Sequence, residues 1–264
     1  MNFAEFKELV IAKAQAMGIA DYELYYQAEE STSVSAFQHE INQFPSSLEG
    51  GVCFRCIVDG KMGYASTEAL NAEQAKAIVA KAADSAAILE AEEQVFLGEG
   101  GQEYEPLTVN AYELPGTEEL INTVLAVHEK IYAADPAVID GCQADTFMEH
   151  SEIAIYNSKG LDLYHSSNCS GLVVVGVVSN GQEMANDYQV KLGKLDEIDS
   201  DEMVHKAVEG AKQKLGGEPA PTGQYPVVFN PDAMSSLLGV YASVFSSEAA
   251  QKGLSRLADK EGQI

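Results

Sequence analysis

The sequence contains no tryptophan, only four cysteines among its 264 residues, and few basic side chains. Lysine and arginine together number 16, against 41 aspartates and glutamates, which gives a formal net charge of -25. Such a charge repels nucleic-acid phosphates and anionic lipid surfaces, so we expect neither a nucleic acid nor a membrane as a partner. A strongly acidic surface suits either plain solubility or the binding of a basic partner.

Long apolar runs are also missing. No stretch approaches the roughly 20 apolar residues that a membrane-spanning helix needs. The longest run, 172–178, contains a glycine and fits a buried strand. The first residues, MNFAEF, lack the basic and apolar segments of a secretory signal. We expect the cysteines of such a chain to be free thiols in a reducing compartment, so the sequence predicts a cytoplasmic protein.

Periodicity predicts an N-terminal α/β domain over residues 1–94, built as a helix, an antiparallel sheet and a second helix. Apolar residues at helical spacing predict the first helix over Phe3–Met17. Asn71 is expected to cap an alanine-rich second helix that runs to about Glu90. Asp59–Gly60 has the composition of a two-residue hairpin turn. Strands are expected at Asp21–Ala28, Ser31–Gln38, Ile41–Leu48, Gly50–Val58 and Lys61–Ser66, with a tight turn at Glu29–Glu30 between the first two.

Residues 95–135 are expected to form a linker and a connecting helix. The stretch 95–116 is rich in glycine, proline and glutamate and predicts no regular element, whereas Thr117–Ala134 has a helical apolar face. Residues 136–264 predict part of a β-rich domain with helices, which makes the fold class α+β. The tail ends as though a strand began there, so we expect the natural chain to continue. The expected elements are strands at Val138–Glu149, Ser151–Asn157, Leu161–Val178, Gln182–Leu192 and Tyr225–Phe229, a turn at Asn180–Gly181, and helices at Ser200–Leu215 and Pro231–Ser246.

Metal ligands are the first candidates for chemistry, because the chain has only five histidines: His39, His128, His150, His165 and His205. A zinc-protease helix carries two histidines about one turn apart, with a glutamate directly after the first. Only His128–Glu129 begins such a motif, and no second histidine follows at the required spacing. A solvated or helix-packed histidine is therefore the favoured reading of His128, over a metal ligand. His150 lies between Glu149 and Glu152, where a surface ion is one reading and a plain strand-end histidine is the favoured one.

Other chemical motifs are equally weak. Cys53 and Cys56 form a lone CxxC pair inside a predicted strand, where side chains three positions apart point to opposite faces. We therefore expect structural thiols rather than a redox or zinc site. The segment 98–101 is glycine-rich but contains Glu99, which disfavours a phosphate loop. On the residues alone, we assign no catalytic, cofactor-binding or metal-binding residue.

Three stretches, taken together, carry a resemblance to a known family. They are 51–67 (GVCFRCIVDGKMGYAST), 155–160 (IYNSKG) and 223–231 (GQYPVVFNP), the last followed by Leu237–Leu238 and Phe245–Ser246. In order and spacing these stretches resemble the TldD/PmbA metalloprotease family, also known as modulator of DNA gyrase. The resemblance covers essentially the whole chain. Family members are longer, so it implies an N-terminal α/β domain followed by part of a β-rich C-terminal domain.

The resemblance also implies a division of labour between two subunits. The TldD-like subunit carries an HExxxH motif on the helix after the third stretch, where it binds zinc and activates water. Here the matching residues, 246–256, read SSEAAQKGLSR and contain no histidine. This departure resembles the PmbA/TldE branch. It implies a noncatalytic subunit of a cytosolic protease of unfolded peptides, with no cofactor of its own and zinc only in its partner.

The expected partners are accordingly a TldD-like subunit in a heterodimer, or a second copy in a homodimer, and unfolded peptides. Tyr25, Tyr26, Phe37 and Phe44 are candidates to line a peptide groove, although a role in the core is the favoured reading. Two alternatives stay open. One is an acidic regulatory protein that acts on DNA gyrase or another basic partner without proteolysis. The other is an enzyme whose site lies beyond Ile264.

Overall fold

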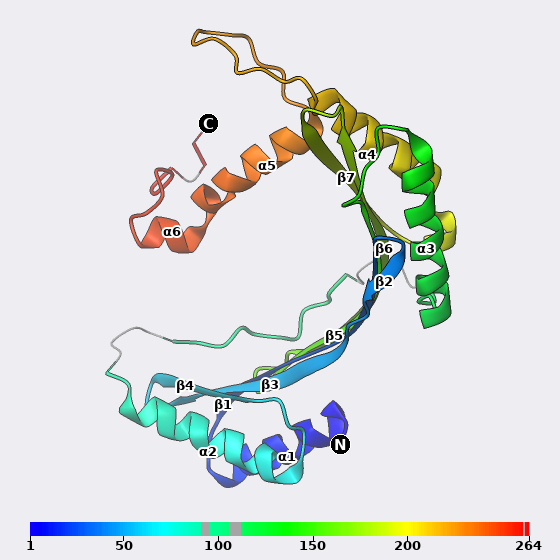
Figure 1. Ribbon diagram of the computed structural model, residues 1–264. Helices are drawn as coiled ribbons and strands as arrows, with labels where there is room; N and C mark the ends of the chain where they lie inside the picture. The colour runs from blue at the N-terminus through cyan, green and yellow to red at the C-terminus, as the bar shows by residue number, and fades with distance from the viewer. Residues whose placement is uncertain (91–94, 106–111, 261, 264) are drawn as a thin grey trace. The chain divides into compact units, whose positions relative to one another are not determined.

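The computed structural model describes residues 1–90, 95–105, 112–260 and 262–263 of the chain (Figure 1). Chain contacts divide it into two compact units, Met1–Gly217, which holds the sheet, and Glu218–Ile264, which is helical. The expected linker has no regular element at 95–105 and 112–116, and its remaining residues, 106–111, lie outside the described residues.

The first unit contains a seven-stranded antiparallel sheet in the order β4-β3-β1-β5-β6-β7, with β2 paired to β1. The fold is therefore α+β, as the sequence predicts. Its strands are β1 Asp21–Phe37, β2 Glu40–Gln43, β3 Ser46–Val58, β4 Lys61–Thr67, β5 Gln143–Asn157, β6 Asp162–Ser179 and β7 Met184–Leu192. Its helices are α1 Phe3–Ala16, α2 Ala72–Ile88, α3 Thr117–Ala134 and α4 Ser200–Lys214, with a 3-10 turn, η1, at Leu195–Glu197.

β1 is a single strand of 17 residues that runs through the tight turn expected at Glu29–Glu30. That prediction was wrong because these residues are held on both edges: Glu29 pairs with Glu49 of β3 and with Ser151 of β5. β5 is likewise continuous through His150, where the sequence predicts two strands. Ladder pairing with neighbouring strands outweighs the low strand propensity of glutamate.

The sheet joins two segments that the sequence assigns to separate domains. β1 comes from residues 1–94 and β5 from residues 136–264, and they pair from Glu23 opposite Asn157 to Phe37 opposite Gln143. β1 can pair with β5 because β1 is an inner strand of the sheet, and β3 pairs with only one of its two edges. The N-terminal helix–sheet–helix arrangement is present, but its sheet continues into the next segment.

The two predicted hairpin turns differ in geometry. Asp59 and Gly60 both have positive φ angles, of 50° and 75°, so the two-residue turn between β3 and β4 is confirmed. In the second turn Gly181 is left-handed at 87° and Asn180 is not. The Asn180 side-chain oxygen instead accepts hydrogen bonds from the backbone nitrogens of Gln182 and Glu183, at 2.9 Å each, and these close a longer loop between β6 and β7.

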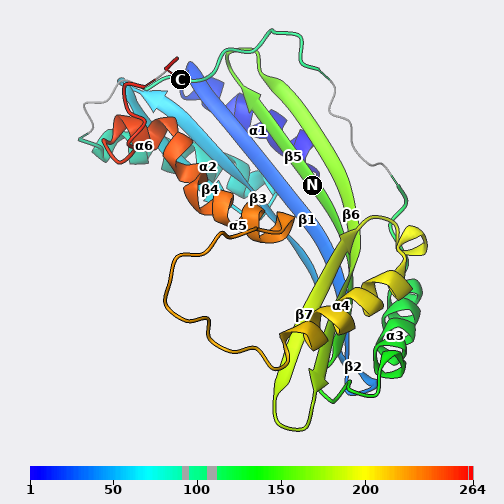
Figure 2. The ribbon, with the colours of Figure 1, turned by 90° about the horizontal axis from the view of Figure 1, so that it is seen from above.

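All four helices cover the same face of the sheet (Figures 1 and 2). On β1, Leu24 belongs to the core under α1 and α2, while Val34 and Ala36 belong to the core under α3 and α4. These three residues share the same parity along the strand, so their side chains leave it on one side. The first core also contains Phe6, Val10, Phe54, Ile78 and Val79, and the second contains Leu120, Val124, Ile131, Leu172 and Val174.

Local signals place the helices well. α3 has the predicted bounds, and α2 begins directly after Asn71, whose side-chain oxygen accepts a hydrogen bond from the Gln74 backbone at 2.9 Å. Such a cap satisfies a backbone donor that the helix itself leaves unpaired. None of the described helices is both long enough and apolar enough to cross a bilayer.

The second unit consists of α5 Pro231–Tyr241, a 3-10 turn, η2, at Ala242–Phe245, and α6 Ser247–Gln251. The strand predicted at Tyr225–Phe229 was wrong. These residues are irregular, and Val228 is 96% exposed. A strand needs a partner for its backbone groups, and none of the described strands pairs with this segment. The final predicted helix also ends earlier, at Tyr241.

Gly63 of β4 allows α2 to lie directly on the sheet. A Cβ atom at this position would lie 2.0 Å from the Ala82 carbonyl oxygen and 2.4 Å from the Ala86 backbone nitrogen. Ala82 and Ala86 are themselves fully buried. Because protein interiors are close-packed, any side chain at position 63 would push α2 away from β4.

We expect Gly63→Ala to lower the free energy of unfolding by about 1–3 kcal/mol, the usual cost of overpacking a core. Urea or thermal unfolding of the purified variant measures this. Gly98→Ala is the matched control, because a Cβ at Gly98 meets nothing within 4 Å, and it should change stability by less than about 0.5 kcal/mol. Equal effects of the two substitutions would contradict the close contact between α2 and β4.

Candidate functional site

The five histidines lie on different elements, and the structure brings two of them together. His39 lies in the turn between β1 and β2, and His128 lies on α3. His150 on β5, His165 on β6 and His205 on α4 lie outside this group. The His150 ring nitrogen Nδ1 is 2.7 Å from the side-chain oxygen of Asn168, and its Nε2 is 3.9 Å from a Glu152 oxygen.

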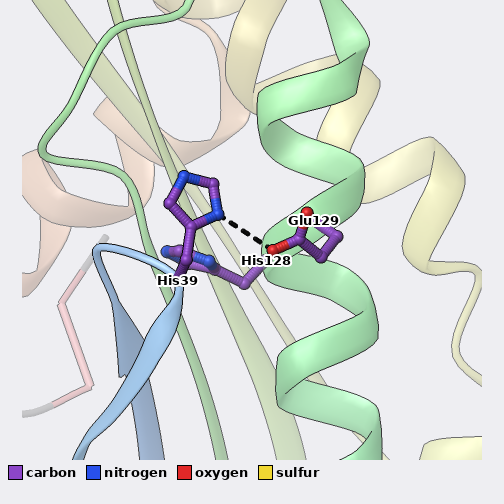
Figure 3. A group of neighbouring side chains, drawn as sticks. All are labelled: His39, His128 and Glu129. Atoms are coloured by element: carbon purple, nitrogen blue, oxygen red, sulfur yellow. Dashed lines mark hydrogen bonds and ion pairs between the residues drawn. The ribbon is translucent and has the colours of Figure 1, made fainter.

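His39, His128 and Glu129 form the group, which we call the His39 cluster (Figure 3). One donor atom from each residue lies within 4.8 Å of the donor atoms of the other two. His39 Nδ1 is 2.9 Å from Glu129 Oε1, so the turn and the helix are linked by a polar contact. The His39 ring also packs against His128 and Tyr132, with centroid separations of 5.4 and 4.3 Å.

His128 is the buried member of the cluster. Its side chain is fully buried, and within the described part of the chain neither ring nitrogen has a hydrogen-bond partner. Burial lowers the pKa of His128, and nearby His39 lowers it further, while the backbone of Cys142 and the Glu129 carboxylate oppose this. The Cys142 backbone lies close to the His128 ring but does not reach hydrogen-bonding geometry with it. The lowered pKa favours the neutral imidazole, whose ring keeps one lone pair free for a proton or a metal ion.

The sequence indicates His128–Glu129 as the possible start of a metal motif, but it does not indicate that His39 lies beside them. A helical zinc motif predicts the second histidine on the same helix, whereas here it comes from a hairpin turn on another element. No spacing rule connects a turn residue with a helix so far along the chain. The one local signal is that a Gln38–His39 turn between two strands would place a histidine at a solvent-exposed tip.

A second polar group gathers residues from two of the family-like stretches. Arg55 of β3 contacts Glu23 of β1, with 2.6 Å between Arg55 Nη2 and Glu23 Oε1. The Asn157 side-chain nitrogen donates to the other Glu23 oxygen at 3.1 Å and to the Gly98 carbonyl at 2.9 Å. These bonds connect three neighbouring strands with the start of the linker.

Asn157 also organises the turn that follows it. Its side-chain oxygen accepts hydrogen bonds from the backbone nitrogens of Lys159 and Leu161, at 2.9 and 3.0 Å. Gly160 in this turn contacts Gly100 of the linker so closely that a Cβ on Gly100 would lie 2.1 Å from the Gly160 carbonyl carbon. Asn157 and the turn that follows it therefore have a structural role, because they hold the linker against the sheet.

The cysteines offer no activated thiol. All four are free. Cys53 and Cys56 lie on opposite faces of β3, and of these two Cys56 is the fully buried one. Burial raises the pKa of each thiol. A thiol with a raised pKa stays protonated near neutral pH and is a poor nucleophile and metal ligand.

An open groove of ≈ 1330 Å³ lies over β1, β3 and β4. Four aromatic residues were candidates for a groove, with the core as the favoured reading. Of these, Tyr25 and Tyr26 border the groove, although the Tyr26 ring itself stacks on Phe3 at 4.4 Å. Phe37, the last residue of β1, and Phe44, directly after β2, do not line the groove. Its acidic lining residues are Glu29, Glu49 and Glu68.

Family models match most of the chain. A PmbA/TldA metallopeptidase domain 1 matches residues 22–86, the central domain of the same family matches 112–215, and its C-terminal domain matches 222–264. Together these ranges cover far more than half of the sequence. A search of curated proteins gives no match.

Solved structures share the fold at low sequence identity. A candidate modulator of a DNA gyrase from Thermotoga maritima has a TM-score of 0.85 and 22% identity, over 98% of this chain and 59% of that one. TldE from Thermococcus kodakarensis has a TM-score of 0.84 and 19% identity, over 97% and 58%. A candidate modulator of DNA gyrase from Bacteroides thetaiotaomicron has a TM-score of 0.84 and 20% identity, over 97% and 60%. The chain thus spans less than two thirds of these proteins' length.

We expect Asn157→Ala to lower the free energy of unfolding by about 2–4 kcal/mol, because it removes four hydrogen bonds and leaves buried partners unpaired. Chemical unfolding measures the loss, and limited proteolysis should show earlier cleavage near Gly98. Asn186→Ala is the matched control, since Asn186 is an exposed strand asparagine on β7. If Asn157→Ala were as mild as Asn186→Ala, the described hydrogen bonds would not hold the linker.

Proposed function

The chain belongs to the PmbA/TldD metallopeptidase family, and we propose that it is a TldE-like, noncatalytic subunit of a cytosolic zinc metallopeptidase that degrades or processes unfolded peptides. The proposal is that a TldD-like subunit supplies the zinc and the catalytic glutamate. This chain then supplies part of the wall that holds the peptide. Because the chain spans about 59% of the Thermotoga maritima protein, the activity is proposed for the whole protein.

One observation carries the proposal. The segment 246–256, where the TldD-like branch has its HExxxH motif, reads SSEAAQKGLSR and offers no imidazole. The short helix α6 lies within it, so the segment is helical in part but lacks the ligands. The donor set of the family's catalytic zinc does not fit these residues, and no catalytic step is assigned to them.

The groove over β1, β3 and β4 supports a role in peptide binding. β4 is an edge strand, and an edge strand offers unpaired backbone groups to an extended peptide. On the groove floor Glu29 and Glu49 lie directly opposite each other across β1 and β3. Like charges in this arrangement repel each other, and a lysine or arginine of a bound peptide would relieve the repulsion.

A second candidate function rests on a different observation. The net charge of -25 and the descriptions of two structural relatives fit an acidic regulator of DNA gyrase or of another basic partner. Such a regulator would associate with its target without any protease subunit, and the association would weaken steeply as salt screens the charges. Proteolysis and salt-dependent association therefore separate the two functions.

The proposed function predicts which mixtures of subunits have peptidase activity. The full-length protein alone should not cleave an unfolded model peptide, and adding a TldD-like subunit from the same organism should produce cleavage that a chelator abolishes. The matched control is the same mixture with the motif glutamate of the TldD-like subunit changed to glutamine, which should be inactive. Cleavage by this protein alone, or full activity of the TldD-like subunit without it, would overturn the proposal.

The proposed function also predicts a preference for basic peptides. In the active mixture, Glu49→Gln should raise KM for lysine-rich peptides by up to about fivefold, since an exposed ion pair contributes up to about 1 kcal/mol. The KM for uncharged peptides should not change. Glu118→Gln on α3, outside the groove, is the charge-matched control. An unchanged preference in Glu49→Gln would remove the groove from the proposed peptide path.

A further inference from the structure

We propose that His39, His128 and Glu129 bind a divalent transition-metal ion, with Zn²⁺ as the favoured ion, and that this ion fastens the β1–β2 turn to α3. The inference goes beyond the proposed function and does not depend on it. It also departs from the sequence-based expectation that this chain holds no metal of its own.

The donor atoms have the chemistry and the spacing that zinc requires. Two imidazoles and one carboxylate form a common zinc ligand set in proteins, with a fourth position open to water. Ligands about 2.1 Å from a tetrahedral ion lie about 3.4 Å from one another. The three donor atoms already lie within 4.8 Å of one another, and His39 Nδ1 and Glu129 Oε1 are 2.9 Å apart.

The side chains that must adjust are the ones free to do so. The His39 and Glu129 side chains are 51% and 66% exposed, so small rotations can bring their donor atoms to a common ion. His128 is fixed by burial beneath them. The ion would therefore enter from solvent between two exposed ligands and reach the buried imidazole of His128.

His128 supplies the strongest argument for a ligand. A buried polar group without a partner costs about 1–3 kcal/mol, so native proteins rarely leave one. Within the described residues both ring nitrogens of His128 and the hydroxyl of neighbouring Tyr132 have no hydrogen-bond partner. Coordination by one ring nitrogen would give His128 the partner that it lacks among the described residues.

The backbone of the turn is consistent with a positioned ligand. Gln38 and His39 both have positive φ angles, of 50° and 66°. This left-handed region is costly for residues other than glycine, and a glycine or asparagine would relieve the strain. Such strain persists where surrounding contacts over-determine the conformation. Here it directs the His39 ring toward α3, as Figure 3 shows.

The test uses the full-length protein, stripped of metal with a chelator and titrated with zinc chloride by calorimetry at neutral pH. We expect one class of site that is lost in defined variants, with Kd raised more than about 100-fold in His39→Ala and in Glu129→Gln, since even the supports of ligands matter 10- to 100-fold. Zinc should also raise the thermal midpoint of the unmodified protein, because it binds only the folded state. Zinc should not raise that of His39→Ala.

Two histidines outside the His39 cluster, exposed His205 and half-buried His150, provide controls. His205→Ala on α4 and His150→Ala on β5 should bind zinc as the unmodified protein does. The test does not need a substitution of buried His128, because His39 and Glu129 lie at the surface and their variants should fold. Absence of zinc binding up to millimolar concentrations would overturn the proposal. So would binding that survives in both His39→Ala and Glu129→Gln, or that is lost in His150→Ala instead.

Discussion

Backbone pairing along both edges of β1 is the constraint on which the first unit depends. This strand of 17 residues lies between β3 and β5, and its side chains enter both hydrophobic cores. Because strand residues alternate between faces, one unbroken register places Leu24 under α1 and α2 and Val34 under α3 and α4. A break at Glu29–Glu30 would have separated the two helix pairs, and the ladder on each side prevents it.

Sequence reasoning succeeded where the determining interactions are local. The Asp59–Gly60 turn, the Asn71 cap and the apolar face of α3 each depend on residues within a turn or two of one another. It failed where the partner is distant in the sequence or absent from the described strands. Glu29 needs Ser151 to stay in a strand, and Tyr225–Phe229 finds no strand to pair with. The His39 cluster was missed for the same reason, because a hairpin turn and a helix surface meet only in the folded chain.

The residues that carry the family resemblance prove to be mainly architectural. Gly63 permits helix contact, Asp59–Gly60 turns the chain, and Asn157 holds the linker against the sheet. Such residues are diagnostic of a fold, because few alternatives satisfy the same backbone, and they say little about chemistry. Function must therefore be argued from the groove over β1, β3 and β4 and from residues 246–256, which contain no HExxxH motif.

The β1–β5 pairing also dictates an order of assembly. Residues 1–90 contain α1, α2, β1, β3 and β4 with a core of their own, so this part can collapse while the ribosome is still making the rest. Until Gln143–Asn157 emerges, the second edge of β1 has no partner and is open to pairing with another chain. Closing so long a loop is slow, because its entropy cost precedes the gain from contacts. Newly made chains should thus pass through a stage in which only dilution or chaperones keep the open edge of β1 from pairing with another chain.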